Sequence, residues 1–407
     1  MTDPIHDFTA KLRQPSLRGH VRDYVSWRKS LARARACGGP APRPPALGPI
    51  SINLDLTTAC NYRCDHCIDW EILNSKHRHD EETLRSSICT MVERGLRSVI
   101  LIGGGEPTIH PGFTDFVGFL KDLELQVAVV SNGSRGDKLF EIANVLEERD
   151  WVRLSLDAGS NELFRAMHRP VKKSLTLDEI CAWVPKIKAR NPRFRIGFSY
   201  IIVWQGAARD DVSLHDNIAE IVQATERAKH HGFDYIALKP VLERDENGAE
   251  VMNPTQAREE LAQVVARIRR EVDRAKQLAS DSFDVHVSTN LRVLEEGSWS
   301  EYRKQPRTCH MQALRQVLTP LGTFNCPAHR GVEKARLGDS DAYRDETVAD
   351  ETGEKLRVLM DRFDASVECR EVTCLYNGVN WWLEKMIEDP REEVDIEPGD
   401  ERLDFFL

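Results

Sequence analysis

The feature that most restricts the fold is an alternation of short β-branched runs with helix-length amphipathic runs between residues 50 and 240. Such alternation predicts parallel strands joined by right-handed crossovers. The expected strands are 51–56, 98–103, 126–131, 151–157, 194–203 and 233–240, and the expected helices are about 80–95, 113–122, 136–148, 176–190 and 216–231. Six such units do not complete an eight-stranded barrel. We therefore expect an α/β fold, a partial (β/α)6 TIM-like barrel, with its site at the carboxyl ends of the strands.

The length of 407 residues favours more than one domain. We expect a basic helix and a Pro-rich linker at 1–49, the partial barrel at 50–290, and a small C-terminal α+β domain at 291–407 with an acidic tail.

A net charge of −9 argues against general nucleic-acid binding, and no apolar run approaches the ~20 residues of a membrane helix. The N-terminus lacks a secretory signal, so the predicted location is the cytoplasm, where ten reduced cysteines are better explained by metal ligation than by disulfides.

Three cysteines follow the first expected strand, in the stretch CNYRCDHC. Cys60, Cys64 and Cys67 have a CxxxCxxC spacing that can converge on one metal centre. Iron–sulfur clusters usually have four thiolate ligands, so three would leave one iron open to an outside ligand. The alternatives at this point are a zinc site completed by His66 or His110, and unrelated free thiols.

Unusual residues occupy the ends of the next strands. Gly103, Gly104, Gly105 and Glu106 follow the second strand, and consecutive glycines let a backbone approach a ligand closely. The glutamate and the exposed carbonyls can accept hydrogen bonds from an ammonium group. Asn132 follows the third strand, and Ser155 and Asp157 lie at the end of the fourth, where their polar groups suit the hydroxyls of a ribose.

The segments CNYRCDHC and GGGEPTIHPGF together resemble the radical S-adenosylmethionine (SAM) superfamily, over about residues 50–240. The resemblance implies that Cys60, Cys64 and Cys67 hold a [4Fe–4S] cluster whose open iron binds the amino and carboxylate groups of SAM. The resemblance also implies roles for other residues. Contacts to SAM are implied for Gly104, Gly105 and Glu106 along the methionine amino group, for Asn132, Ser155 and Asp157 near the sugar and sulfonium, and for Arg169 near the carboxylate. Tyr62 is implied to shield the cluster, and His66 to pack beneath it.

A second group of cysteines lies in the C-terminal region. Cys309, Cys326, Cys369 and Cys374 come from an expected hairpin, VLTPLGTF, and from a CxxxxC pair that enters a helix. Four thiolates suit one complete cluster. They resemble the auxiliary-cluster extension of SPASM or twitch type, and their number matches one auxiliary [4Fe–4S] cluster, as in the shorter twitch arrangement. A zinc ribbon is the alternative, because the same four ligands could make one.

The remaining segments allow more than one interpretation. The basic helix at about 20–37 is interpreted as a solvated helix docked by its apolar side, with a nucleic-acid or anionic-substrate role of its arginines as the alternative. The acidic tail is interpreted as a solvated or loosely docked segment; the alternative is that it folds over this helix or caps the substrate opening. A charged helix is expected at about 254–279 and a short strand at 283–288. Cys89 and Cys181 are expected to behave as small buried hydrophobes, with hydrogen donation to a substrate radical as the alternative.

The resemblance implies an oxidoreductase-type enzyme. In that family SAM is cleaved reductively to a 5′-deoxyadenosyl radical, which takes a hydrogen atom from the substrate, and an electron donor such as flavodoxin or ferredoxin is needed. A fully ligated auxiliary cluster favours oxidation or bond formation on a small biosynthetic molecule such as a sugar, aminocyclitol or nucleoside. The alternatives are a maturase of a ribosomal peptide, a redox-neutral epimerase, and a non-catalytic iron–sulfur or zinc protein. No acid, base or hydrogen-donor residue is identified from the sequence.

Overall fold

The computed structural model describes residues 6–209, 212–254, 257 and 260–407. The chain packs as two compact units. The central unit comprises Asp55–Lys76 and Ile100–Trp299, and the terminal unit comprises Met1–Leu54, His77–Val99 and Ser300–Leu407. Strand β2 (Ser98–Leu101) begins in the terminal unit and ends in the central one.

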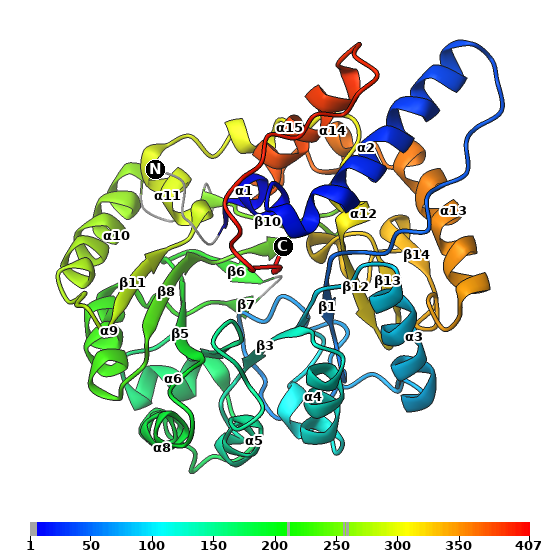
Figure 1. Cartoon of the computed structure of the whole chain (residues 1–407). Helices are drawn as coiled ribbons and strands as arrows, with labels where there is room; N and C mark the ends of the chain where they lie inside the picture. The colour runs from blue at the N-terminus through cyan, green and yellow to red at the C-terminus, as the bar shows by residue number, and fades with distance from the viewer. Residues whose placement is uncertain (1–5, 210–211, 255–256, 258–259) are drawn as a thin grey trace. The chain divides into compact units, whose positions relative to one another are not determined.

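The central unit is built on a parallel sheet (Figure 1). Its strands pair in the order β11-β8-β5-β4-β3, and every pair is parallel. These strands are β3 (Gln126–Ser131), β4 (Trp151–Ser155), β5 (Arg195–Ile202), β8 (Tyr235–Pro240) and β11 (Asp284–Val287). Parallel strands need long crossovers between them, and helices supply these connections.

The helices of the central unit lie outside its strands (Figure 1). They are α4 (Phe113–Asp122), α5 (Gly136–Ile142), α6 (Asn161–His168), α7 (Leu177–Cys181), α8 (Val184–Arg190), α9 (Ile221–His230), α10 (Leu261–Lys276) and α11 (Thr289–Glu296). Side chains cap several of their first turns: Ser160 accepts a hydrogen bond from the Leu163 amide, and Thr176 and Glu179 form a reciprocal capping box. Such caps satisfy amides that the helix itself leaves unpaired.

Short elements complete the central unit. They are the 3-10 helices η2 (Pro107–Ile109) and η3 (Ile218–Glu220), and two hairpins made of β6 (Ala208–Arg209) with β7 (Val212–Ser213) and of β9 (Glu243–Arg244) with β10 (Glu250–Val251).

The terminal unit has a smaller sheet. Strand β1 (Ser51–Leu54) pairs in parallel with β12 (Arg315–Thr319), and β12, β13 (Gly322–Phe324) and β14 (Arg336–Gly338) form antiparallel pairs. Its helices are α1 (Phe8–Leu12), α2 (Pro15–Ala36), α3 (Glu81–Glu93), α12 (Met311–Leu314), α13 (Glu346–Arg362), α14 (Ala365–Glu368) and α15 (Asn377–Glu388), with short 3-10 turns η5 (Glu301–Arg303), η6 (Pro327–His329) and η7 (Glu333–Ala335).

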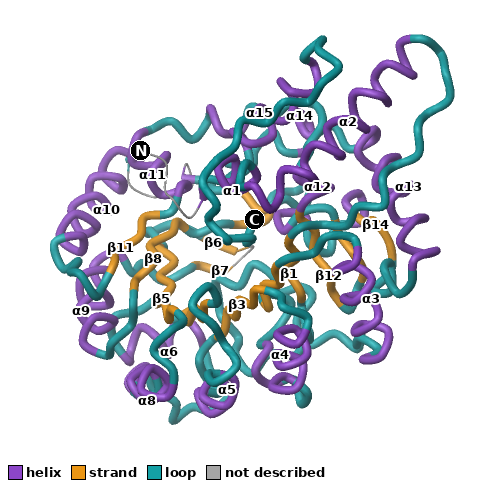
Figure 2. The backbone as a smooth tube through the Cα atoms, in the orientation of Figure 1, coloured by secondary structure: helices purple, strands orange, loops and turns teal. Residues whose placement is uncertain are grey.

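The C-terminal tail runs along α1 and α2, as the loop beside these helices in Figure 2 shows. The Lys11 ammonium, which is buried, donates to the Phe406 carbonyl at 2.7 Å and pairs with Asp404 at 2.9 Å. The Lys29 ammonium donates to the carbonyls of Asp389 and Arg391. The tail therefore folds over the basic N-terminal helix, as the alternative interpretation of the sequence has it.

The structure confirms the mixed α/β fold with a large parallel sheet and the six strands expected between residues 50 and 240, each within a few residues. The strand order of the described residues is open, with no pairing that closes a barrel.

The helix expected at 176–190 is two helices, because Pro185 lies in the first turn of α8 and supplies no amide to continue α7. Helix α5 ends at Ile142 instead of 148, and α10 begins at Leu261; residues 255, 256, 258 and 259 of the expected helix lie outside the described ranges. The boundaries at 49/50 and 290/291 stay a prediction.

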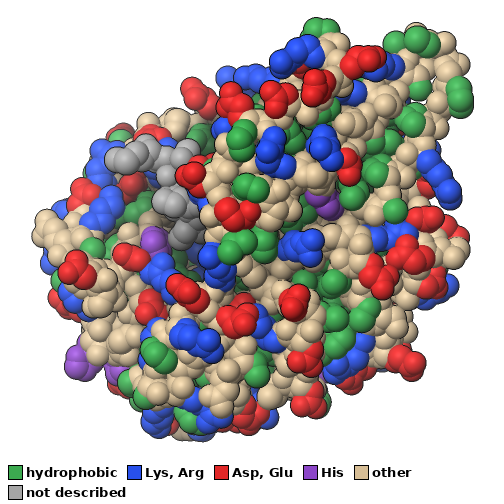
Figure 3. All heavy atoms as spheres, viewed as in Figure 1, with side chains coloured by type: hydrophobic (Ala, Val, Ile, Leu, Met, Phe, Trp, Pro, Cys, Tyr) green, Lys and Arg blue, Asp and Glu red, His purple; other side chains and the backbone are tan. Residues whose placement is uncertain are grey.

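Acidic and basic side chains are interspersed over the face of the molecule drawn in Figure 3, as on ordinary globular proteins. None of the helices in the described ranges combines the length and the apolar character that crossing a membrane requires.

The docking of the tail is testable at Lys11. A Lys11→Met substitution removes the donor that the buried Phe406 carbonyl faces, so we expect a loss of about 1–3 kcal/mol in the free energy of unfolding, measured by urea denaturation. Arg13→Met removes a pair with Glu397 whose carboxylate is 84% exposed, and we expect it to cost less than about 1 kcal/mol. Equal effects of the two substitutions would contradict the structural role of Lys11.

Candidate functional site

The three N-terminal cysteines lie on one loop, residues 55–76, that leaves strand β1. Backbone bonds hold this loop in place: the Glu106 amide donates to the Ala59 carbonyl at 2.8 Å, and the Asn74 amide donates to the Thr58 carbonyl at 2.7 Å. The Asn74 side chain in turn accepts a hydrogen bond from the Cys60 amide at 3.0 Å. The loop is thus fixed although it contains neither helix nor strand.

The thiols of Cys60, Cys64 and Cys67 lie close enough for neighbouring sulfurs to affect their pKa values. Burial raises the pKa of Cys60 to about 11 and that of Cys67 to about 12, and raises the pKa of Cys64 further above the usual value. The neighbouring thiols add to the rise at Cys64 and Cys67. Three half-buried thiols of this kind become thiolates when a positive metal centre compensates their charge.

Glycines let the loop after β2 pack directly on the cysteine loop. A Cβ atom at Gly105 would lie 2.3 Å from the Ala59 carbonyl oxygen and 2.7 Å from that of Thr57. Gly104 has a φ of +62°, a conformation that favours glycine, and its amide donates to Asp69 at 3.3 Å. In the described residues, no hydrogen bond reaches the carbonyls of Gly104 and Gly105, so both can accept one from an ammonium group.

The Glu106 carboxylate joins the ends of strands β2 and β3. It is buried and accepts hydrogen bonds from the Thr108 amide and hydroxyl, from the Ser131 hydroxyl at 2.7 Å and from the Asn132 amide at 2.6 Å. Burial raises the pKa of Glu106, and these four donors oppose the rise. Both carboxylate oxygens are therefore engaged within the protein, and the contact expected with an ammonium group is left to the backbone carbonyls of the glycines.

Tyr62 and Asn132 lie against the cysteine loop. The Tyr62 ring is buried, packs edge-on against Phe164 and His168, and donates its hydroxyl hydrogen to the Asn132 carbonyl at 3.3 Å. The Asn132 side chain donates to Asn61 at 2.9 Å. These contacts place an aromatic ring and an amide beside Cys60 and Cys64.

Asp157 connects the end of β4 to the cysteine loop through two histidines. It has a φ of +50° and is buried. One carboxylate oxygen accepts a hydrogen bond from the Ile201 amide at 2.7 Å, and the other lies 3.0 Å from Nε2 of His66 and 3.4 Å from Nε2 of His168. Burial raises the pKa of Asp157, but the two imidazoles and the Ile201 amide lower it more, so that the carboxyl stays ionised.

His168 was not found from the sequence, and it contacts Cys64 directly. Its Nδ1 lies 3.2 Å from the Cys64 sulfur, and its Nε2 lies 2.9 Å from the Leu156 carbonyl. Burial lowers the pKa of His168 to about 4, so the ring is neutral. A neutral ring that donates from Nε2 to Leu156 leaves Nδ1 to accept the Cys64 thiol proton. No local sequence pattern could predict the contact between Cys64 and His168, because the two residues are 104 positions apart in the chain.

Arginines surround the cysteine loop. Arg169, which has a φ of +43°, pairs with the buried Asp65 at 2.9 Å, and its side chain is 54% exposed. Arg209 donates to the Cys64 carbonyl at 3.0 Å, and Arg244 pairs with Asp69 at 3.2 Å. Of these, only Arg169 was a candidate from the sequence; the other two come from hairpins about 140 to 175 residues further along the chain.

The four C-terminal cysteines gather within the terminal unit. Cys309 precedes α12, Cys326 follows β13, Cys369 ends α14 and Cys374 precedes α15. Burial raises the pKa of Cys369 and Cys374 well above the usual value, and the nearby sulfurs of Cys309 and Cys326 raise both further. Asn380 donates to the Cys309 sulfur at 3.6 Å, and His329 lies 3.5 Å from that of Cys369.

Zinc would bring its ligand atoms close together. Thiolates on one tetrahedral zinc ion lie about 3.8 Å apart, given the usual Zn–S bond length. Among the described residues, one set of three or more His, Cys, Asp or Glu side chains has its ligand atoms within 4.8 Å of one another, and it consists of His66, Asp157 and His168. Neither cysteine group forms such a set among the described residues.

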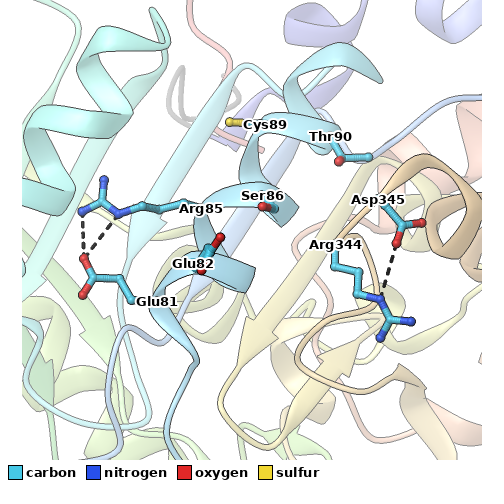
Figure 4. Close-up of a pocket in the computed structure, with 8 residues that line it drawn as sticks. All are labelled: Glu81, Glu82, Arg85, Ser86, Cys89, Thr90, Arg344 and Asp345. Atoms are coloured by element: carbon cyan, nitrogen blue, oxygen red, sulfur yellow. Dashed lines mark hydrogen bonds and ion pairs between the residues drawn. The ribbon is translucent and has the colours of Figure 1, made fainter.

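A surface pocket lies elsewhere, in the terminal unit (Figure 4). It is lined by α3 residues that include the ion pair of Glu81 with Arg85, and by Arg344 and Asp345. The half-buried Cys89 also lines it, whereas Cys181 is fully buried in α7. The arginines that line this pocket are paired with acidic side chains beside them, and the pocket is open on one side, so we assign it no catalytic role.

Known proteins resemble this chain over its central part. Residues 54–253 match the radical SAM superfamily. The chain is 30% identical over 110 residues to an S-adenosylmethionine-dependent nucleotide dehydratase of Thermoplasmatales archaeon (strain ISO4-H5), a match that covers 26% of this chain and 38% of that protein. It is 33% identical over 121 residues to the mycofactocin maturase MftC of Mycobacterium tuberculosis, covering 28% of this chain and 29% of MftC. The matched parts thus span about a third of the length of these relatives.

The fold also resembles solved structures. SuiB of Streptococcus suis bound to S-adenosylmethionine superposes with a TM-score of 0.53 at 13% identity, over 79% of this chain and 70% of SuiB. At this level of identity the likeness concerns the fold alone.

The close packing at Gly105 yields a prediction. Gly105→Ala places a methyl group against the backbone of the cysteine loop, so we expect a loss of about 1–3 kcal/mol in stability and less iron bound after reconstitution. Iron is measured per chain, and stability by urea denaturation.

Gly118→Ala is the matched control, because Gly118 lies in α4 with nothing within 4 Å of an added Cβ. We expect this substitution to gain about 0.5–1 kcal/mol and to leave the iron content unchanged. A Gly105→Ala protein with the iron content of the wild type would show that the two loops need not touch.

Proposed function

We propose that this protein is a radical SAM enzyme that oxidises a small biosynthetic molecule by two electrons, because residues 54–253 match the radical SAM superfamily. The observation that carries the proposal is the packing of the cysteine loop against Gly104 and Gly105, which sets three half-buried thiols beside two backbone carbonyls that can accept hydrogen bonds. Loop and carbonyls belong to the same compact unit.

In this proposal Cys60, Cys64 and Cys67 hold a [4Fe–4S] cluster, because three thiolate ligands leave one iron for another ligand. The cluster and SAM, when bound, supply a 5′-deoxyadenosyl radical that removes a hydrogen atom from the substrate. Tyr62 covers the cluster with a buried ring, which excludes water from reactive species. His168, held by the Leu156 carbonyl at Nε2, orients its Nδ1 towards the Cys64 sulfur.

We assign the remaining contacts to SAM from the positions of the residues at the ends of the strands. The carbonyls of Gly104 and Gly105 accept the methionine ammonium, and Glu106 holds their loop in place through Ser131 and Asn132. Ser155, which ends β4, offers its hydroxyl to the ribose, while Asp157 orients His66 beneath the cluster. Arg169 reaches the methionine carboxylate if it leaves its surface pair with Asp65.

We assign the auxiliary cluster to Cys309, Cys326, Cys369 and Cys374. Four ligands leave no iron open, so this cluster would accept the electron that remains after hydrogen abstraction instead of binding substrate. That role fits a net oxidation. A redox-neutral epimerisation would need a thiol donor, and Cys181 is fully buried, with a pKa that burial raises to about 12.

The substrate class is proposed from the relatives. The nucleotide dehydratase at 30% identity favours a nucleotide or another small molecule. The likeness to the maturase MftC is compatible with the alternative from the sequence, a maturase of a ribosomal peptide, which stays the second candidate. An external one-electron donor such as flavodoxin or ferredoxin would reduce the N-terminal cluster.

Anaerobic reconstitution tests the enzyme assignment. Reduced protein with SAM is expected to release 5′-deoxyadenosine, measured by chromatography, and a Cys60→Ala protein is expected to release none. Release by Cys60→Ala at the rate of the wild type would remove the assignment of the first cluster. A protein that binds zinc instead of iron, and leaves SAM intact, would remove the enzymatic function as a whole.

Metal content tests the auxiliary site separately. Wild-type protein is expected to hold about eight irons per chain, and Cys369→Ser about four, because each cubane holds four. Cys181→Ser is the control, since Cys181 lies in α7 and belongs to neither group. If Cys369→Ser instead loses one zinc and no iron, the C-terminal cysteines form a zinc site.

A further inference from the structure

Four exposed cations lie in the segment that runs from helix α6 into the turn after it. Residues 163–175 contain Arg165, Arg169, Lys172 and Lys173 and neither aspartate nor glutamate. All four of these basic residues are exposed. The chain as a whole carries a net charge of −9, so this segment is a local basic surface on an acidic protein.

The basic segment is bonded directly to the cysteine loop. The Val171 amide donates to the Asn61 carbonyl at 3.0 Å, and the Asp65 amide donates to the Met167 carbonyl at 3.0 Å. Asp65 directly follows Cys64, and all three thiols of the loop are half-buried. The segment therefore lies along the loop that carries the thiols, with its cations exposed beside it.

Most of the charge on this surface is unpaired. No ion pair or hydrogen bond joins the side chains of Arg165, Lys172 or Lys173 to another residue within the ranges that the structure describes. The same holds there for Arg63, an exposed residue of the cysteine loop itself. Arg169 differs, because it pairs with Asp65. Charges that the protein leaves unpaired stay available to an outside partner.

An apolar side chain lies among these cations. Val171 is 62% exposed, more than any other large hydrophobic side chain of the described residues. Its amide is bonded to the cysteine loop, so its position at the surface is fixed. An apolar centre with a charged rim is the usual composition of a protein interface. We call this surface the basic patch, and it consists of Arg63, Arg165, Val171, Lys172 and Lys173.

We propose that the basic patch is the docking surface for an acidic protein that donates single electrons to the N-terminal cluster. Such a donor is repelled by a chain of net charge −9, and a basic patch beside the thiols steers it to the place where its electron is needed. One electron leaves the donor and enters the cluster, and no bond forms or breaks. The inference rests on the proposed function, and it adds the charge and the docking place of the electron donor.

Calorimetry with an acidic bacterial flavodoxin, in its oxidised form, tests this surface. Reconstituted wild-type protein is expected to bind the flavodoxin, and to bind it more weakly as the salt concentration rises, because salt screens exposed charges. The double substitution Lys172→Gln/Lys173→Gln is expected to weaken binding about threefold to tenfold at low ionic strength. The matched control, Lys186→Gln/Lys276→Gln, removes two exposed charges from α8 and α10 and is expected to bind as the wild type does.

Formation of 5′-deoxyadenosine separates docking from chemistry. With reduced flavodoxin below saturation as the donor, we expect the Lys172→Gln/Lys173→Gln protein to be slower than the wild type by about the factor seen in binding. With dithionite, a small reductant that needs no docking surface, we expect equal rates.

Equal binding of flavodoxin to the wild type and to the Lys172→Gln/Lys173→Gln protein, or an equal loss in the control, would overturn the docking surface. So would the absence of saturable binding to the wild type, and binding of a single-stranded oligonucleotide in its place would assign the patch to nucleic acid. Circular dichroism shows whether each variant folds, and Arg165→Gln replaces a double variant that does not. A wild type that forms no 5′-deoxyadenosine with dithionite contradicts the proposed function, whereas the binding measurement alone decides the docking surface.

Discussion

The candidate site depends on the contact between two backbones, that of Gly105 and that of residues 57–59. At 2.3 Å from a carbonyl oxygen, no Cβ fits at this position, so the loop after β2 can lie flat on the cysteine loop. The contact brings the carbonyls of Gly104 and Gly105 to the cysteines. It also places Glu106 where its amide bonds to Ala59 and its carboxylate bonds to the end of β3. One steric requirement thus joins three segments of the chain.

A second set of polar contacts extends the arrangement to the end of β4. Asp157 bonds to the backbone of β5 and to His66 in the cysteine loop, and His168 reaches the Cys64 sulfur from the end of α6. These buried groups satisfy one another, which fixes the ring orientations beside the thiols. These contacts therefore hold the two histidines in place beside the cysteine loop.

Much of this could be predicted from the sequence, because its causes are local. Runs such as QVAVVS and SVILIG have the composition of buried strands, and their ranges were correct within a few residues. The three-cysteine spacing and the glycines after β2 marked the loops that the structure brings together. The split at Pro185 was missed because the apolar periodicity continues across it.

Contacts between distant segments could not be predicted in this way. His168 and Arg209 each derive their importance from a partner on another segment of the chain, and no spacing pattern marks them. The role of Glu106 likewise depends on contacts with other segments of the chain. Its sequence position suggested a ligand for an ammonium group, whereas the four donors around it show that it anchors a loop.

The division of the chain into units has a consequence for the order of assembly during synthesis. The terminal unit combines segments from both ends of the sequence, so its four cysteines cannot gather until Cys374 has left the ribosome. The central unit has its three cysteines, both histidines and Asp157 by residue 168. Because chains fold from the N-terminus as they emerge, the three cysteines of the loop can come together while the C-terminal group is still incomplete. If both groups hold clusters as proposed, iron would be delivered to them sequentially, and first to the N-terminal group.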